Sequence, residues 1–149
     1  CKDEEKYLVV QELVKKGWVA NIKKITFNKN VDSRGVLTSI EQKSDIPISI
    51  KRIFYMTEIN SGRGGHAHID TDQVIVCLKG SFEIKIFDGE KFFEKKMNSA
   101  YEGLYIPRML FVDMINFSND CVCLVLANTK YDMKKSIRDI DEYNYLLNS

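Results

Sequence analysis

Apolar and polar residues alternate along most of the chain between residues 19 and 129. The segment 82–87 reads FEIKIF, and in the segment 74–78 the residues Val74, Val76 and Leu78 recur at every second position. A period of two is typical of β-strands, because successive side chains point to opposite faces of a sheet. The pattern therefore predicts a series of short strands.

Turn-forming residues separate these predicted strands at intervals of about eight to twelve residues. They occupy positions 33–35, 45–47, 60–65, 79–81, 88–89 and 119–120. A parallel α/β sheet requires helices between its strands, and no long helical pattern lies between these segments. The spacing predicts an all-β fold in the form of an antiparallel sandwich or barrel.

Helical patterns occur only near the two ends of the chain. Residues 4–16 carry apolar side chains four positions apart and stop at Gly17, which predicts a short amphipathic helix. The tail 132–147 is charged with interspersed apolar residues, which predicts a closing helix. Because there is no internal repeat and no low-complexity linker, we expect one domain. It comprises a helical extension over residues 1–18 and a β-domain with a C-terminal helix over residues 19–149.

Charge and hydropathy exclude several classes of function. The chain has 149 residues, with 22 Lys and Arg against 21 Asp and Glu, and a formal net charge of +1. Charges of both signs are dispersed, so we expect no nucleic-acid partner. No apolar run approaches the roughly 20 residues that cross a bilayer, and the first residues are charged. We therefore expect no membrane span and no secretion signal, and a cytoplasmic location.

Four cysteines, at positions 1, 77, 121 and 123, contain no C-x-x-C pair. Except for Cys1, they lie in apolar segments, as reduced and buried thiols of a cytoplasmic protein do. Cys121 and Cys123 would share one strand face, but two thiolates without further ligands make a poor metal site. We expect neither disulfides nor a zinc site.

The two histidines of the chain both fall in the segment 63–68, which reads RGGHAH. In an extended segment His66 and His68 project to the same side, while Ala67 faces the other way. If that side faces a barrel interior, two imidazoles line one cavity, and each can accept and donate a proton near neutral pH. The alternative is a pair of surface histidines in a glycine-rich loop. The H-x-H pattern alone does not decide between the two.

The residues around the histidines resemble the first motif of the cupin superfamily. Gln73 stands at the position of that motif's acidic residue, and Gly80 at the position of its later glycine. The segment 103–116 is similar to the second cupin motif, in which metal-binding members supply a third histidine, and here that position is Val112. Two imidazoles without an acidic ligand or a third histidine leave a divalent ion underbound. We therefore predict no metal, so that the histidines act as acid, base or hydrogen-bonding groups.

A closer resemblance, over nearly all of residues 24–145, is to the sugar-nucleotide 3,4-ketoisomerases of the WxcM-like branch. The similar segments are 32–35 (DSRG), 50–55 (IKRIFY), 63–68 (RGGHAH), 77–81 (CLKGS), 103–107 (GLYIP), 116–118 (NFS), 125–127 (VLA), 131–132 (YD) and 137–143 (IRDIDEY). This resemblance implies a cupin fold, a double-stranded β-helix or jelly-roll barrel with short helices at both ends. It also implies a homodimer that exchanges N-terminal strands, for which the alternating segment 22–27 is suited.

The activity implied by the resemblance is the isomerisation of a nucleoside-diphospho-4-keto-6-deoxyhexose, typically dTDP-linked, to its 3-keto isomer. Such products are used in the biosynthesis of deoxyamino sugars for surface polysaccharides. The reaction removes the acidified C3 proton, passes through an enediol and returns a proton at C4. Two neighbouring imidazoles match this demand without a cofactor, and we assign proton transfer to His66 and His68.

Further residues are expected to bind the substrate. Arg34, Arg52 and Arg63 are suited to the diphosphate, because a guanidinium presents paired donors to phosphate oxygens. Tyr55 is placed to donate to the keto oxygen, and Gln73 to orient a histidine or a sugar hydroxyl. Each has a structural alternative: a surface salt bridge for an arginine, packing for the tyrosine, and a polar strand end for the glutamine.

Three departures from the family pattern leave other functions open. The chain has Phe54 where the family commonly has Tyr, Ile69 where it has Lys, and Val112 where it has His. One alternative is a sugar-nucleotide 3,5-epimerase, although those enzymes pair a single catalytic histidine with Asp and Tyr. The other is a non-catalytic sugar-nucleotide-binding cupin domain of a larger protein, with which a chain that starts at Cys1 is compatible.

Overall fold

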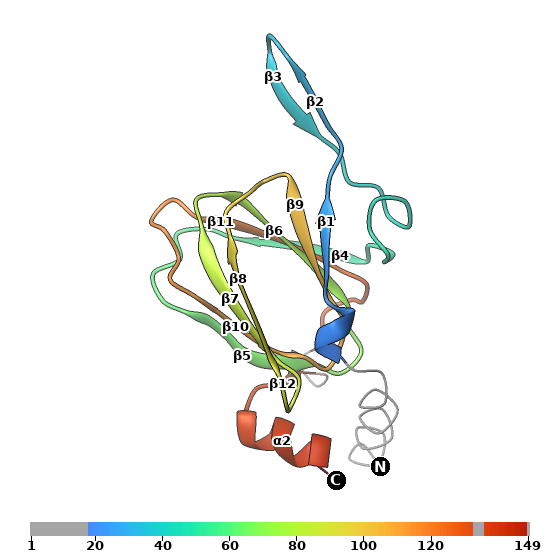
Figure 1. Ribbon diagram of the computed structural model, residues 1–149, viewed down its shortest axis with the longest axis vertical. Coiled ribbons are helices and arrows are strands. Elements are labelled where there is room, and N and C mark those ends of the chain that lie inside the picture. Colours follow the sequence, from blue (N-terminus) through green and yellow to red (C-terminus); the bar gives the residue numbers. More distant parts are fainter. Residues whose placement is uncertain (1–17, 133–135, 149) are drawn as a thin grey trace.

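The computed structural model describes residues 18–132 and 136–148 (Figure 1). The helix predicted over residues 4–16 lies outside the described residues. The elements are η1 (Trp18–Asn21), β1 (Lys23–Thr26), β2 (Lys29–Asp32), β3 (Gly35–Thr38), β4 (Arg52–Met56), β5 (Arg63–His68), β6 (Gln73–Lys79), β7 (Phe82–Phe87), β8 (Phe92–Met97), β9 (Glu102–Ile106), β10 (Phe111–Ile115), β11 (Val122–Ala127), β12 (Ser136–Ile137) and α2 (Ile140–Asn148). Among the described residues, no helix is long and apolar enough to cross a membrane.

Two five-stranded antiparallel sheets face each other and form the body of the molecule (Figure 1). Their strand orders are β1-β9-β6-β11-β4 and β12-β5-β10-β7-β8. Strands that are neighbours in space are far apart in the sequence, as in β6 beside β11 and β5 beside β10. The predicted all-β, cupin-like jelly roll is confirmed, although the two sheets do not close into a continuous barrel.

The strand β6 is buried on both of its faces and connects two apolar clusters. Ile75 and Cys77 point into the main core between the sheets. Val74 and Val76 point outward, where they pack in a second cluster that includes Phe27 and residues of the 40–50 segment. Because the 40–50 segment covers the outer face of β6, both faces of this strand are buried, and its sequence is an unbroken apolar run.

The hairpin of β2 and β3 projects away from the sheets (Figure 1). Val31 and Leu37 are 67% and 62% exposed on it. At its tip, Arg34 forms an ion pair with Asp32 through contacts of 2.7 Å between Nη2 and Oδ2. Because they are exposed, these apolar side chains are available for packing against another surface. Such packing would stabilise the hairpin, since an isolated two-stranded hairpin is only marginally stable in water.

The C-terminal tail corrects one prediction, because it is not a single helix over 132–147. Ser136 and Ile137 form β12, which pairs with His68 and Ala67 of β5. Ile137 is fully buried there, and its β-branched side chain suits an extended backbone. The helix α2 begins only after Asp139, whose carboxylate accepts a hydrogen bond of 2.9 Å from the Asp141 amide and so caps the first turn.

Candidate active site

A cavity of about 550 Å³ lies between the two sheets. Its polar lining consists of Arg52, Arg63, His66, His68, Gln73, Tyr131, Ser136 and Arg138. Its apolar wall consists of Phe54, Met56, Ile75, Val112, Met114 and Val125. An apolar cavity with a few converging polar groups is typical of a small-molecule site.

His66 and His68 lie side by side in this cavity, as their spacing on one strand predicts. Their ring centroids are 5.0 Å apart and the rings meet edge to face at 84°. Ala67, between them, is fully buried on the opposite face of β5. The Ser136 hydroxyl lies 3.4 Å from Nδ1 of His68 and helps to orient that ring.

The backbone around the histidines is held by local features of β5 and its neighbours. Gly64 and Gly65 have φ values of 121° and 67°, which residues other than glycine rarely adopt. Opposite them, β10 has a bulge between Val112 and Asp113. The last residue of the strand, His68, accepts a hydrogen bond of 2.7 Å at its carbonyl from the Met109 amide. These constraints fix the direction in which the imidazoles project.

The environment of His68 keeps its imidazole neutral. Burial lowers its pKa from 6.5 to about 4, and the electrostatic interactions of His68 with His66 and Arg52 act in the same direction. A neutral imidazole has an unprotonated ring nitrogen at neutral pH, which is the form that accepts a proton. His68 therefore has the protonation state of a general base.

We expect the imidazole of His68 to titrate with a midpoint near pH 4 rather than 6.5. The unfolded chain binds this proton with the ordinary pKa, so it holds more protons than the folded chain between the two values. Stability should therefore be retained above about pH 6.5 and fall as the pH drops towards 4. NMR of the imidazole C–H resonances measures the midpoint, with His68→Asn as the control that assigns the signal. A midpoint near 6.5 would contradict the buried, neutral state.

The cavity also concentrates positive charge. Arg52 is placed between two aromatic rings, with its guanidinium carbon 5.2 Å from the centroid of Phe54 and 5.3 Å from that of Tyr131. Its Nε is buried and has no hydrogen-bond partner within the described part of the chain. Arg63 and Arg138 line the same cavity. A buried donor without a partner, beside further guanidinium groups, suits an anionic ligand.

Five of the residues predicted from the sequence meet in this cavity: His66, His68, Arg52, Arg63 and Gln73. Gln73 opens β6 and is only 7% exposed, so its amide faces the cavity rather than solvent. The structure therefore brings together the predicted histidines, the glutamine and two of the three predicted arginines.

Tyr55 and Arg34 are not brought to the cavity of their own chain. Tyr55 is 70% exposed, because the side chains of β4 alternate and those of Arg52 and Phe54 face inward. Arg34 lies at the tip of the projecting β2–β3 hairpin, and its side chain is 88% exposed. Neither residue lines the cavity within one chain, and their role in substrate binding stays a prediction.

Three polar lining residues were missed from the sequence: Tyr131, Ser136 and Arg138. All three belong to the segment that follows β11, and Ser136 and Arg138 lie in the tail 132–147, for which a helix had been predicted. Tyr131 and Arg138 lie in the segments YD and IRDIDEY, which match the family pattern although no chemistry had been attached to them, whereas Ser136 lies in neither segment. The β12 pairing with β5 is what brings Ser136 to His68.

The donors at the histidine pair do not fit a transition metal. Val112 lies opposite His66 in the β5–β10 pairing, and its side chain offers no ligand. Gln73 offers only a neutral amide, and no group of three or more His, Cys, Asp or Glu suited to a metal occurs in the described ranges. Cys77, Cys121 and Cys123 are buried free thiols, and burial raises the pKa of Cys77 and Cys123 to about 12. That the protein works without metal stays a prediction.

Comparison with known proteins gives consistent matches over this fold and site. The family model described as FdtA, WxcM-like, C-terminal, matches residues 20–148. A TDP-4-oxo-6-deoxy-alpha-D-glucose-3,4-oxoisomerase of Aneurinibacillus thermoaerophilus is 42% identical over 123 residues, covering 81% of this chain and 88% of the relative.

Solved structures extend these matches. A mutant of the 3,4-ketoisomerase QdtA of Thermoanaerobacterium thermosaccharolyticum, in complex with TDP-4-keto-6-deoxyglucose, is similar with a TM-score of 0.81 and 37% identity, covering 84% of this chain and 92% of that one. The rmlC epimerase of Mycobacterium tuberculosis is similar with a TM-score of 0.68 and 14% identity, covering 79% of this chain and 68% of that one. The second likeness is one of fold alone.

Proposed function

Since the chain belongs to the WxcM-like FdtA family, we propose that it is a sugar-nucleotide 3,4-ketoisomerase that acts on a TDP-linked 4-keto-6-deoxyhexose. The observation that carries this function is the pair of imidazoles 5.0 Å apart, both lining one cavity. The reaction belongs to deoxysugar biosynthesis, and we place it in the cytoplasm, on the route to amino sugars for polysaccharides.

The proposed chemistry is a pair of proton transfers. The C4 ketone acidifies the C3 proton, and a neutral imidazole removes it while the C4 oxygen gains a proton, which gives an enediol with a C3–C4 double bond. The C3 hydroxyl then loses its proton as the C3 ketone forms, and C4 receives a proton. His68, held neutral by burial, is suited to accept a proton, and His66 lies close enough to share the transfers.

The basic groups of the cavity are proposed to hold the nucleotide. Arg52, Arg63 and Arg138 face the same space, and the buried Nε of Arg52 lacks a partner that a phosphate oxygen would supply. Gln73 is assigned to a sugar hydroxyl or to a histidine. A complex of the related QdtA with a TDP-keto sugar supports this class of ligand.

We propose further that the working unit is a homodimer in which residues 19–149 form the catalytic domain and residues 1–18 a helical extension. Exposed apolar side chains support this dimer. They are Val31 and Leu37 on the β2–β3 hairpin and Ile53 and Tyr55 on the outer face of β4. In such a dimer Arg34, at the tip of the same hairpin, would lie close to the interface between the two copies. Light scattering after gel filtration should give the mass of two chains, and a monomer would exclude this arrangement.

Solvent exchange tests the function and separates it from its alternatives. The protein is incubated with TDP-4-keto-6-deoxyglucose in deuterated water, and the sugar is followed by NMR. A 3,4-ketoisomerase should introduce deuterium at C4 of the 3-keto product and, through the reverse reaction, at C3 of the 4-keto sugar. Labelling of C3 and C5 would identify an epimerase, and no labelling despite binding would identify a non-catalytic domain.

A further inference from the structure

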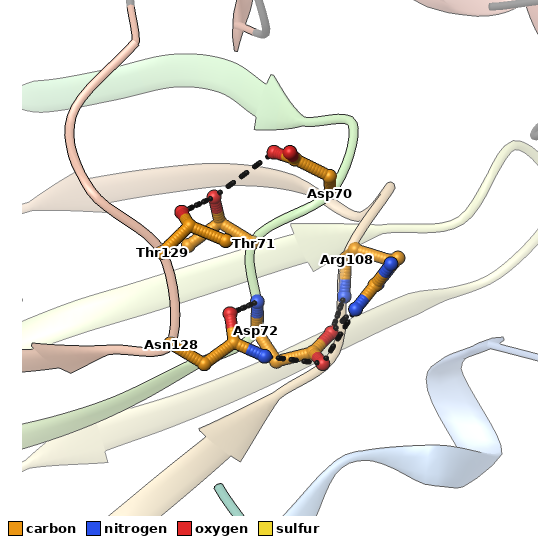
Figure 2. Close-up of polar contacts among 6 residues, drawn as sticks. All are labelled: Asp70, Thr71, Asp72, Arg108, Asn128 and Thr129. Carbon is orange, nitrogen blue, oxygen red and sulfur yellow. Dashed lines mark hydrogen bonds and ion pairs between the residues drawn. The ribbon is translucent and has the colours of Figure 1, made fainter. Parts of the chain in front are cut away.

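The loop 69–72 connects two residues of the cavity. It starts after His68, the last residue of β5, and ends before Gln73, the first residue of β6. Its position therefore sets how these two side chains stand relative to each other, although its own residues do not line the cavity. Several polar contacts hold the loop in place (Figure 2).

Asp72 is the centre of these contacts. Its Oδ1 accepts hydrogen bonds from the Arg108 amide at 2.8 Å and from Arg108 Nε at 3.2 Å. Its Oδ2 accepts from Arg108 Nη2 at 3.1 Å and from Asn128 Nδ2 at 3.0 Å. Figure 2 shows the two partners approaching the carboxylate from separate segments of the chain. Both oxygens are therefore fully engaged as acceptors.

Asn128 completes the attachment on the other side. Its Oδ1 accepts a hydrogen bond of 2.8 Å from the backbone amide of Asp72, and the backbone amide of Asn128 donates to the Asp72 carbonyl at 3.2 Å. Next to this pair, the hydroxyls of Thr71 and Thr129 are 2.6 Å apart. The loop is thus fastened along the segment that follows β11, close to where that strand pairs with Gln73.

The same cluster reaches the backbone of His68. Arg108 is followed by Met109, which has a φ of 63° and is fully buried. The Met109 amide donates the hydrogen bond of 2.7 Å to the His68 carbonyl, while the Arg108 amide donates to Asp72. Two consecutive amides of the β9–β10 turn therefore hold the two ends of the loop.

We propose that Asp72 is a positioning residue, which through Arg108 and Asn128 sets the placement of His68 and Gln73 for the reaction. The inference rests on the proposed isomerase function. The side chain of Asp72 is only 15% exposed and does not line the cavity, so it acts through these neighbours and not on the substrate. A change in the loop displaces the base relative to the sugar, and a displacement of about 1 Å can lower a rate by about 100-fold.

Asp72→Asn is the direct test. Only donors converge on both carboxylate oxygens, so an amide of the same shape turns its NH₂ towards a donor in either orientation. We expect kcat to fall by about 10- to 100-fold while KM and the affinity for TDP change by less than about 3-fold. The imidazole ¹⁵N resonances of His68, recorded without substrate, should shift as well.

Glu102→Gln is the matched control, because it removes the acid of another ion pair, with Lys95 at 3.7 Å, from the same strand that leads to Arg108. It should change neither kcat nor the His68 resonances. Arg108→Ala leaves the Arg108 amide bonded to Asp72, so it should cause a smaller fall in kcat than Asp72→Asn. This second variant carries the test if Asp72→Asn does not fold.

The outcomes separate the inference from the function on which it rests. An unchanged kcat and unchanged His68 resonances in Asp72→Asn would overturn the positioning role. The role would also be overturned if the fall in kcat were fully explained by a smaller fraction of folded protein, or if the affinity for TDP fell by the same factor as kcat. A wild-type protein without isomerase activity would reject the proposed function, and the His68 resonances would still decide whether Asp72 places that ring.

Discussion

His68→Asn should lower kcat for the isomerisation by about 10²- to 10⁴-fold, because it removes a group that transfers protons. Asparagine fills part of the space of the imidazole and retains hydrogen-bonding capacity towards the Ser136 hydroxyl, which lies 3.4 Å from the ring in the native protein. It has no nitrogen that accepts a proton near neutral pH. The rate of deuterium incorporation at C4 of the 3-keto product measures the loss.

His66→Asn should have an effect in the same range, since the two rings share one cavity and lie 5.0 Å apart. The affinity of each variant for TDP, measured by calorimetry, serves as the control and should remain close to that of the native protein. A variant that lost TDP binding would report damage to the cavity. If both variants retained the full rate, the assignment of proton transfer to these histidines would be wrong.

Gly64→Ala should destabilise the fold by about 2–6 kcal/mol, because it combines backbone strain with a clash. A Cβ at this position would stand 2.5 Å from the Val112 carbonyl oxygen and 2.8 Å from the Asp113 Cα, both of which are backbone atoms. The φ of 121° is unfavourable for alanine in addition. Urea unfolding followed by circular dichroism measures the change in the free energy of unfolding.

Two other glycines divide this effect into its parts. Gly35→Ala meets nothing within 4 Å at a φ of 136°, so it reports strain without a clash. Gly62→Ala has neither a positive φ nor a contact below 3.4 Å and should change stability by less than about 0.5 kcal/mol. A Gly64→Ala variant as stable as Gly62→Ala would show that β10 moves aside at its bulge without a penalty.

The alternation of apolar residues was sufficient to predict the strands and the common side of the histidines. It held in β7, where Phe82, Ile84 and Ile86 are buried. The same rule explains why Tyr55 does not face the cavity of its own chain, because it is three positions from Arg52 and so lies on the opposite face of one strand. The resemblance had named both residues without regard to this geometry.

What the sequence did not predict depends on contacts between distant segments. The pairing of β12 with β5 joins residues 68 and 70 positions apart, and no local sequence pattern predicts it. The burial of Ile137 in that pairing replaced the expected helical turn. The cluster around Asp72 was likewise hidden, because Arg108 and Asn128 are 36 and 56 positions away.

The short strand β12 and the glycines of β5 have one more consequence, which concerns association between molecules. β12 covers the edge of β5 only at Ala67 and His68, and among the described residues no strand lies beside positions 63–65 on that side. An uncovered strand edge invites pairing with another chain, but glycines in left-handed conformations and a bulged neighbour distort its ladder of amides and carbonyls. The irregular backbone that directs the imidazoles therefore also hinders edge-to-edge pairing of this strand with other molecules and the fibres that such pairing would form.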